Sequence, residues 1–171
     1  MYASPTDLLD LFGAAEVAGI ARPDDLPPDV RVSGALMRLV AMDGDQSGYP
    51  PDEVAAADRT LARIRLVLTQ VSARMDTYLA RQHTLPLPGA LIASGPFVQI
   101  CADLARFAMD DDSVDQAVRT RHDDATRWLE RIASGQALLS GQADPSSGGH
   151  AGVGRVQATP GVVFFGALDG F

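Results

Sequence analysis

Apolar residues between positions 51 and 88 recur at alternating spacings of three and four. They are Leu61, Ile64, Leu68, Val71, Met75 and Tyr78. This spacing places all six on one stripe of an α-helix. Asp52 follows two prolines, where it can cap the helix, and Glu53 adds a negative charge to the first turn. We predict a long central helix that continues toward Arg81 and stops at Leu85-Pro86-Leu87-Pro88, because proline lacks an N–H and forces the preceding residue out of helical geometry.

The opposite face of this helix is polar and mostly basic. It carries Arg59, Arg63, Arg65, Gln70, Arg74 and Gln82. Such a face is usually only solvated, although it can also meet a partner. We expect this side of the helix to be wet or to face a partner.

Shorter helices are predicted on the N-terminal side. Ser4-Pro5-Thr6-Asp7 combines a serine cap, a proline at the first helical position and an acidic residue three positions after the cap. The apolar residues Leu8, Leu9, Leu11 and Phe12 follow, and Gly13 allows a break before a second helical segment over 14–20. The segment 33–42 reads as a short helix with Leu36, Leu39 and Val40 inward, but its valines leave a strand open.

Two more helices are predicted after the proline segment. Pro96 opens the first, which turns Phe97, Ile100, Cys101, Leu104 and Phe107 to one side and ends at Asp110-Asp111-Asp112. Ser113 and Gln116 form a capping-box pattern before the second, which extends to a Gly135 stop and places Trp128 in the core. The expected fold is mainly α, a small helical bundle built on one long central helix.

The composition changes near residue 140. Residues 140–160 are rich in Gly, Ser, Ala and Pro, which predicts a flexible arm, and 162–171 form a β-prone apolar tip. We therefore divide the chain into a helical domain, 1–139, and an arm with a C-terminal docking segment, 140–171. The tip either adds a strand to a partner or folds back on its own domain, because an uncovered strand invites aggregation.

Charge and composition narrow the function. The chain has 14 basic and 22 acidic residues, a net charge of −8, and no basic cluster, which disfavours a protein that grips nucleic acid. The acidic balance suits a channel wall that repels DNA, and equally ordinary solubility. No apolar run is long enough to span a membrane, and the first residues lack a signal-peptide pattern, so we expect synthesis and retention in a cytoplasm. The single cysteine, Cys101, is expected to be a buried thiol.

No pattern in the sequence argues for an enzyme, a cofactor or a metal. Asp43, Asp45 and Ser47 alternate as calcium ligands do, but the closing position of such a loop is Val54. The glycine-rich stretch 149–156 lacks the lysine and hydroxyl residue of a phosphate loop. The three histidines have no paired ligand spacing, and Asp123-Asp124 beside His122 is typical of a solvated helix face.

The block 71–87 resembles Mu-like prophage proteins that are commonly labelled as phage proteins of unknown function. It reads Val-Ser-Ala-Arg-Met-Asp-Thr-Tyr-Leu-Ala-Arg-Gln-His-Thr-Leu-Pro-Leu here, against Ala-Glu-Ile-Asp-x-Tyr-Leu-Ala-x-Arg-Tyr-x-Leu-Pro-Leu in that family. The segment 101–107 resembles the family's Cys-Asp-Ile-Ala-Arg-Tyr, and similarity extends to the first residues, the last helix and the C-terminal end. The chain differs in Arg74, in His83, in a longer 23–52 region and in lacking a C-terminal arginine.

This resemblance implies a head-tail connector, an adaptor that completes the head and lies in the virion beneath the portal. Its partners would be the portal protein, neighbouring copies in a ring (a dodecamer matching the portal) and a stopper or tail-completion protein, while DNA passes through without specific binding. We expect portal docking through Val162, Val163, Phe164, Phe165 and Phe171. We expect ion pairs within or between subunits at Asp76, Arg81, Asp103 and Arg106. The alternative is a helical protein-binding regulator of phage or prophage origin that builds no ring.

Overall fold

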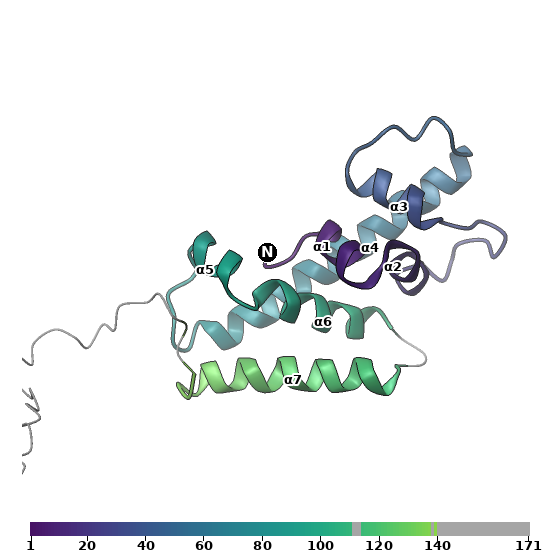
Figure 1. Ribbon diagram of the computed structural model, residues 1–171. Coiled ribbons are helices and arrows are strands. Elements are labelled where there is room, and N and C mark those ends of the chain that lie inside the picture. The colour runs from purple at the N-terminus through teal and green to yellow at the C-terminus, as the bar shows by residue number, and fades with distance from the viewer. Residues whose placement is uncertain (111–113, 138, 140–171) are drawn as a thin grey trace, which may run out of the picture. The chain divides into compact units, whose positions relative to one another are not determined.

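The computed structural model describes residues 1–110, 114–137 and 139, and these residues form an all-helical fold (Figure 1). The helices are α1 (Pro5–Phe12), α2 (Ala14–Ile20), α3 (Gly34–Ala41), α4 (Pro51–Leu79), α5 (Gly89–Ser94), α6 (Phe97–Met109) and α7 (Gln116–Ala133). The mainly α fold class is thereby confirmed. The predicted flexible arm, the β-prone tip and residues 111–113 of the acidic turn and capping box lie outside the described residues.

Helix α4 is the central element. Its 29 residues extend about 44 Å at 1.5 Å per residue. Of the predicted apolar stripe, Leu61, Ile64, Leu68, Val71 and Met75 are buried, while Tyr78 is half-buried against the core. The helix contacts α3, α6 and α7 as well as α1, so a single apolar stripe organises most of the bundle.

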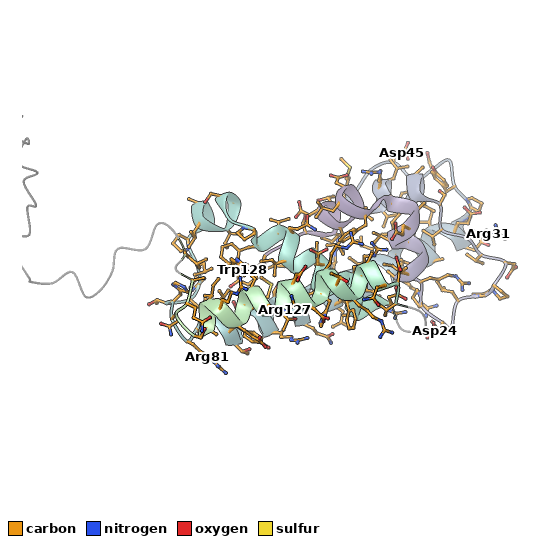
Figure 2. All side chains as sticks on the ribbon, turned by 60° about the horizontal axis from the view of Figure 1, so that its bottom comes forward. Asp24, Arg31, Asp45, Arg81, Arg127 and Trp128 are labelled. Carbon is orange, nitrogen blue, oxygen red and sulfur yellow. The ribbon has the colours of Figure 1, made fainter. Side chains whose placement is uncertain are left out.

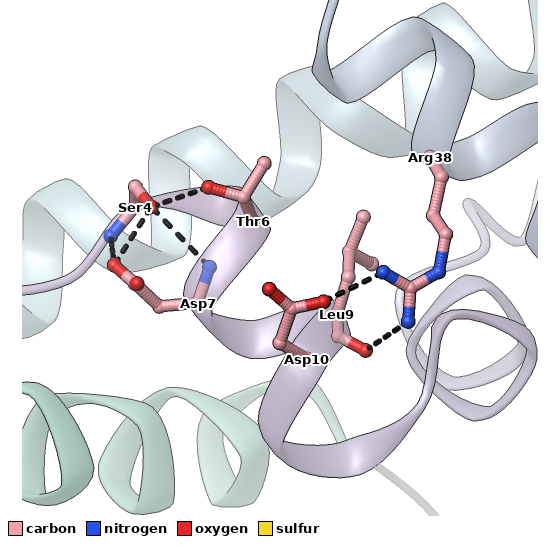
Figure 3. Close-up of polar contacts among 6 residues, drawn as sticks. All are labelled: Ser4, Thr6, Asp7, Leu9, Asp10 and Arg38. Carbon is pink, nitrogen blue, oxygen red and sulfur yellow. Dashed lines mark hydrogen bonds and ion pairs between the residues drawn. The ribbon is translucent and has the colours of Figure 1, made fainter.

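Helices α1, α2 and α3 gather at the N-terminal end of α4 (Figure 1). The predicted capping box at the start of α1 is confirmed: the Asp7 N–H donates to Ser4 Oγ at 3.3 Å, and the Ser4 N–H donates to Asp7 Oδ2 at 2.7 Å (Figure 3). Gly13 separates α1 from α2 with a φ of 89°, a value that favours glycine. Gly34 lets α3 approach α2 closely, because a Cβ there would lie 2.8 Å from the Ala15 backbone nitrogen.

Helices α6 and α7 pack against each other and against α4. Phe97 is fully buried at the start of α6, where its ring stacks on Tyr2 with centroids 5.7 Å apart and meets the Trp128 ring edge-on at 5.5 Å. Trp128 is half-buried and packs against the core, as predicted. Cys101 is a buried free thiol, also as predicted.

Several local predictions are wrong. Asp52 does not cap α4: the N-cap is Pro50, and Asp52 lies inside the first turn because Pro51 already occupies the first helical position. Helix α4 ends at Leu79, two residues before Arg81. Helix α7 begins at Gln116 with Asp115 as its N-cap, so Gln116 is not the third residue of a capping box.

The 33–42 segment is a helix, which settles the helix-or-strand alternative. Ser33 caps it by accepting a hydrogen bond from the Leu36 N–H at 3.2 Å. Leu36 and Val40 are buried as predicted, but Met37 takes the third core position and Leu39 is only half-buried. Leu11 of α1, predicted within an apolar patch, is likewise 44% exposed. Helix α5 was not predicted, and none of its residues is fully buried.

Candidate interaction surfaces

Tyr2 fastens the N-terminus across α4 and α6. Its N–H donates to Ser72 Oγ at 3.3 Å, its hydroxyl donates a short hydrogen bond to Asp76 Oδ1, and its ring stacks on Phe97. The side chain is only 6% exposed. Burial, then the hydrogen bond to Asp76 and the negative charge of that carboxylate, raise the pKa of the Tyr2 hydroxyl well above its usual value. Tyr2 therefore stays neutral and acts as a buried donor to Asp76.

A pocket of about 350 Å³ opens beside this contact. Its lining consists of Met1, Tyr2, Asp76, Leu85, Pro86, Leu87 and Ile92. The motif block 71–87 supplies four of these side chains, from the last turns of α4 and from the proline segment. Four residues of the sequence block that resembles Mu-like prophage proteins thus line a pocket together with the N-terminal residues Met1 and Tyr2.

Arg106 ties α6 to the N-terminal helices. Its guanidinium forms an ion pair with Glu16 of α2 and lies 5.0 Å above the ring of Phe12. Arg121 of α7 reaches the same ring at 5.7 Å. A cation close to an aromatic face is attracted by the ring quadrupole. Phe12 consequently joins two arginines from different helices to the end of α1.

Asp103 lines a second pocket, of about 330 Å³, between α6 and α7. The lining is Pro96, Ile100, Asp103, Arg121, Asp124, Ala125 and Trp128. Asp103 is 8% exposed, its Oδ2 accepts from Gln99 Nε2 at 3.1 Å, and its buried Oδ1 has no hydrogen-bond partner among the described residues. Asp124 accepts instead from Arg127 at 2.8 Å. Asp103 is therefore the pocket carboxylate with unused acceptor capacity.

The outer face of α4 is exposed along its length. We define it by Arg65, Leu66, Arg74 and, in the turn after the helix, Arg81. Leu66 is 57% exposed, and the side chains of the three arginines make no hydrogen bond or ion pair within the described residues. Arg81 points away from the helices in Figure 2.

Of the six residues predicted on the polar face, all but the half-buried Arg63 are exposed. Arg59 pairs with Asp25, and Gln82 donates to the Ala133 carbonyl. The predicted exposure is thus confirmed in part, and a partner on this face stays a prediction.

The four residues predicted to form ion pairs are not brought together. Asp76 accepts from Tyr2, Asp103 accepts from Gln99, Arg81 is exposed, and Arg106 pairs with Glu16. Of these four residues, only Arg106 makes an ion pair with another element of the described part of the chain. Pairing of the other three between subunits stays a prediction. The predicted portal-docking residues Val162, Val163, Phe164, Phe165 and Phe171 lie outside the described residues.

Acidic side chains gather in the loops at the N-terminal end of α4, where Figure 2 labels Asp24 and Asp45. An ion pair with Arg59 lowers the pKa of the Asp25 carboxyl, and the backbone N–H of Ser47, donating to Asp45 at 2.9 Å, lowers the pKa of Asp45. The bond from Ser47 to Asp45 makes this part of the alternating Asp and Ser pattern a hydrogen-bonded turn. Within the described ranges no three His, Cys, Asp or Glu side chains are grouped to hold a metal ion.

The long-range contacts were not foreseen. Tyr2 and Asp76 are 74 positions apart, and Glu16 and Arg106 are 90 apart by the same numbering. The sequence gives one local signal for the contact between Tyr2 and Asp76. This signal is a tyrosine next to the N-terminus, in a segment with no helical periodicity. The pocket beside Asp103 had no sequence signal, because the helical pattern over 97–107 leaves Asp103 off the apolar side.

The family model described as Bacteriophage Mu, Gp36 matches residues 2–158. The chain belongs to this family. Membership in the Gp36 family confirms the phage origin that the motif block implied, and the match covers all described helices. It ends before residue 162, so the tip residues predicted to dock on the portal lie beyond it. No curated protein matches this Gp36-family chain. None of its described helices is long and apolar enough to cross a membrane.

Proposed function

We propose that this Gp36-family protein is a head-tail connector, an adaptor that forms a ring beneath the portal and joins the capsid to the tail. It would be made in the host cytoplasm and end in the virion at the head-tail interface. The observation that carries the proposal is the outer face of α4 in a phage-family chain. This helix of about 44 Å leaves the side chains of Arg65, Leu66 and Arg74 exposed, and no side-chain hydrogen bond or ion pair joins the two arginines to the described residues.

Ring assembly accounts for such a face. Subunits related by rotation about a ring axis meet through two different surfaces, and each subunit must present both. The outer face of α4 supplies one of them, and the α6 and α7 side of the bundle offers the other. The proposal assigns the protein a structural role without catalysis, cofactor or metal.

The net charge of −8 suits a passage for DNA. Neutralising phosphates drives non-specific DNA binding, and an acidic ring would repel the phosphates and let the duplex pass. In this proposal the partners above and below the ring are the portal protein and a stopper or tail-completion protein. The apolar tip, with Val162, Val163, Phe164, Phe165 and Phe171, docks on the portal by strand addition or by filling apolar pockets.

Mass photometry of the protein mixed with the portal from the same genome tests this function. The full-length chain should add a discrete mass of many copies to the portal. A version that ends at Thr159, and a full-length Phe164→Ser/Phe165→Ser variant, should add none while retaining the circular dichroism of the helical fold. Unchanged assembly by both versions would refute docking through the tip. No added mass by the full-length chain, together with one-to-one binding of another phage or host protein, would favour the regulator.

A further inference from the structure

The pocket between α6 and α7 has the composition of a receptor for a cationic side chain. Pro96, Ile100 and Ala125 supply apolar wall, Trp128 supplies an aromatic surface, and Asp103 supplies a carboxylate. Trp128 extends from α7 to the Phe97 ring of α6 and so lies in the seam between the two helices (Figure 2). Apolar walls accommodate an aliphatic stem, while an aromatic face and a carboxylate attract its charged end.

The Asp103 carboxylate needs a donor. Its side chain is 8% exposed, and Oδ1 is buried without a hydrogen bond in the part of the chain that the structure describes. Buried polar atoms in native proteins nearly always have a partner. The other charged groups of the pocket are engaged elsewhere: Asp124 with Arg127 at 2.8 Å, and Arg121 above Phe12. An arginine suits this pocket better than a lysine, because the planar guanidinium can pair with the Asp103 carboxylate through two hydrogen bonds and can stack on the Trp128 ring.

The chain itself carries arginines that suit this pocket. Arg65, Arg74 and Arg81 on the outer face of α4 are exposed and have no partner within the described residues. Helix α4 contacts both α6 and α7 through its buried side, so its outer face points away from the seam between them. An arginine of this face therefore cannot serve the pocket of its own chain, but it can serve that of a neighbour.

Arg74 lies at the same level of the bundle as the pocket. Ser72 Oγ is 3.9 Å from Cys101 Sγ, and Tyr2 connects Ser72 and Asp76 to Phe97, at the start of the helix that carries Asp103. Copies in a closed ring are related by rotation without translation, so contacting residues lie at equal height along the ring axis. Where α4 runs along that axis, Arg74 of one copy meets the pocket of the next.

We propose that the guanidinium of Arg74 enters the α6–α7 pocket of a neighbouring copy of this chain and pairs there with Asp103. The inference rests on the proposed ring and names its subunit contact. This pairing places a guanidinium against the Asp103 carboxylate at the pocket lining and gives the outer face of α4 a partner.

A double-mutant cycle on the full-length chain tests the pairing. Self-association is measured by sedimentation velocity for wild type, Arg74→Gln, Asp103→Asn and the double variant. Each single change should weaken association about tenfold or more. The double variant should self-associate about as strongly as the single variant with the lower affinity, because both substitutions disrupt the same contact. Effects that multiply would mean that the two residues act apart and would overturn the pairing.

Trp128 supplies an independent signal, since it is the single tryptophan and lines the pocket. Its quenching by acrylamide should decrease as wild type associates, but not in Arg74→Gln at the same concentrations. Arg31→Glu, a larger charge change in the exposed loop before α3, serves as the control and should change association by less than about threefold. If Asp103→Asn loses its helical circular dichroism, Arg74→Gln and the Trp128 signal decide the question: unchanged association and quenching would overturn the pairing.

The outcome is separable from that of the proposed function. If wild type builds a ring on the portal, but the affinity losses of the two single variants multiply in the double variant, only the pairing fails. If wild type self-associates through coupled Arg74 and Asp103 but adds nothing to the portal, the connector role fails and the contact stands. If wild type associates neither alone nor on the portal, both are wrong.

Discussion

Replacing Tyr2 by phenylalanine isolates one contact that fastens the N-terminus to α4. The ring and its stacking on Phe97 are retained, and only the hydroxyl that donates to Asp76 is lost. A hydrogen bond to a charged group contributes about 1.5–3 kcal/mol, and Tyr2 is only 6% exposed. We expect the free energy of unfolding to fall by that amount, which corresponds to a Tm lower by about 3–12 °C.

Urea unfolding followed by Trp128 fluorescence and by circular dichroism measures this loss. Tyr78→Phe is the matched control, because Tyr78 is a half-buried tyrosine of α4 whose hydroxyl makes no hydrogen bond with the described residues. It should change the free energy of unfolding by no more than about 0.5 kcal/mol. If the free energy of unfolding falls by the same small amount in both variants, with unchanged m values, the Tyr2 hydroxyl does not hold the N-terminus.

The pH dependence of this difference has a definite sign. Burial and Asp76 raise the pKa of Tyr2 in the folded protein, whereas in the unfolded chain it is about 10. Above about pH 10 the unfolded state loses the proton first, so the wild type loses up to about 1.4 kcal/mol of stability per pH unit. Tyr2→Phe lacks this loss. The stability difference between the two proteins should therefore be full below about pH 10 and shrink above it; a constant difference would refute the assignment.

Three further predictions concern the core and the first helix. Phe97→Ala should lower the free energy of unfolding by about 3–5 kcal/mol because a fully buried ring is lost, whereas Phe97→Leu should cost less than half of that in the same urea titration. Ser4→Ala removes the cap of α1 and should cost about 1 kcal/mol, while Ser94→Ala at the exposed end of α5 should cost under about 0.5 kcal/mol. The Cys101 thiol should react with a thiol reagent only after denaturation, because burial excludes the reagent and raises the pKa of the thiol; rapid reaction of the native protein would contradict its burial.

Local rules predicted the elements whose evidence lies within a few residues. The capping box at Ser4, the break at Gly13 and the stripe of α4 depend on neighbours in sequence, and the structure confirms each of them. The start of a helix was predicted at the wrong residue where two neighbouring residues could each serve as the N-cap. Pro51 occupies the first helical position of α4, and Asp115, which makes no side-chain capping bond, stands at the N-cap position of α7 where Ser113 was expected.

The candidate surfaces could be predicted only in part. Exposure of the arginine-bearing side of α4 follows from helical periodicity and was expected. The contacts of Tyr2 with Asp76 and of Arg106 with Glu16 depend on how the helices pack, and helical periodicity does not encode which helices meet. The burial of Asp103 was missed for the same reason: the pattern within its own helix leaves it off the apolar side, yet it is 8% exposed and lines a pocket between α6 and α7.

Counting copies in purified particles tests the connector role most directly. Quantitative mass spectrometry of virions, with isotope-labelled peptides of this chain and of the portal as standards, gives the ratio of the two proteins. An adaptor ring that matches the portal predicts about one copy of this chain per portal subunit, in particles that retain it through a density gradient. Particles that carry no copies, or far fewer than one per portal subunit, would contradict the proposed ring.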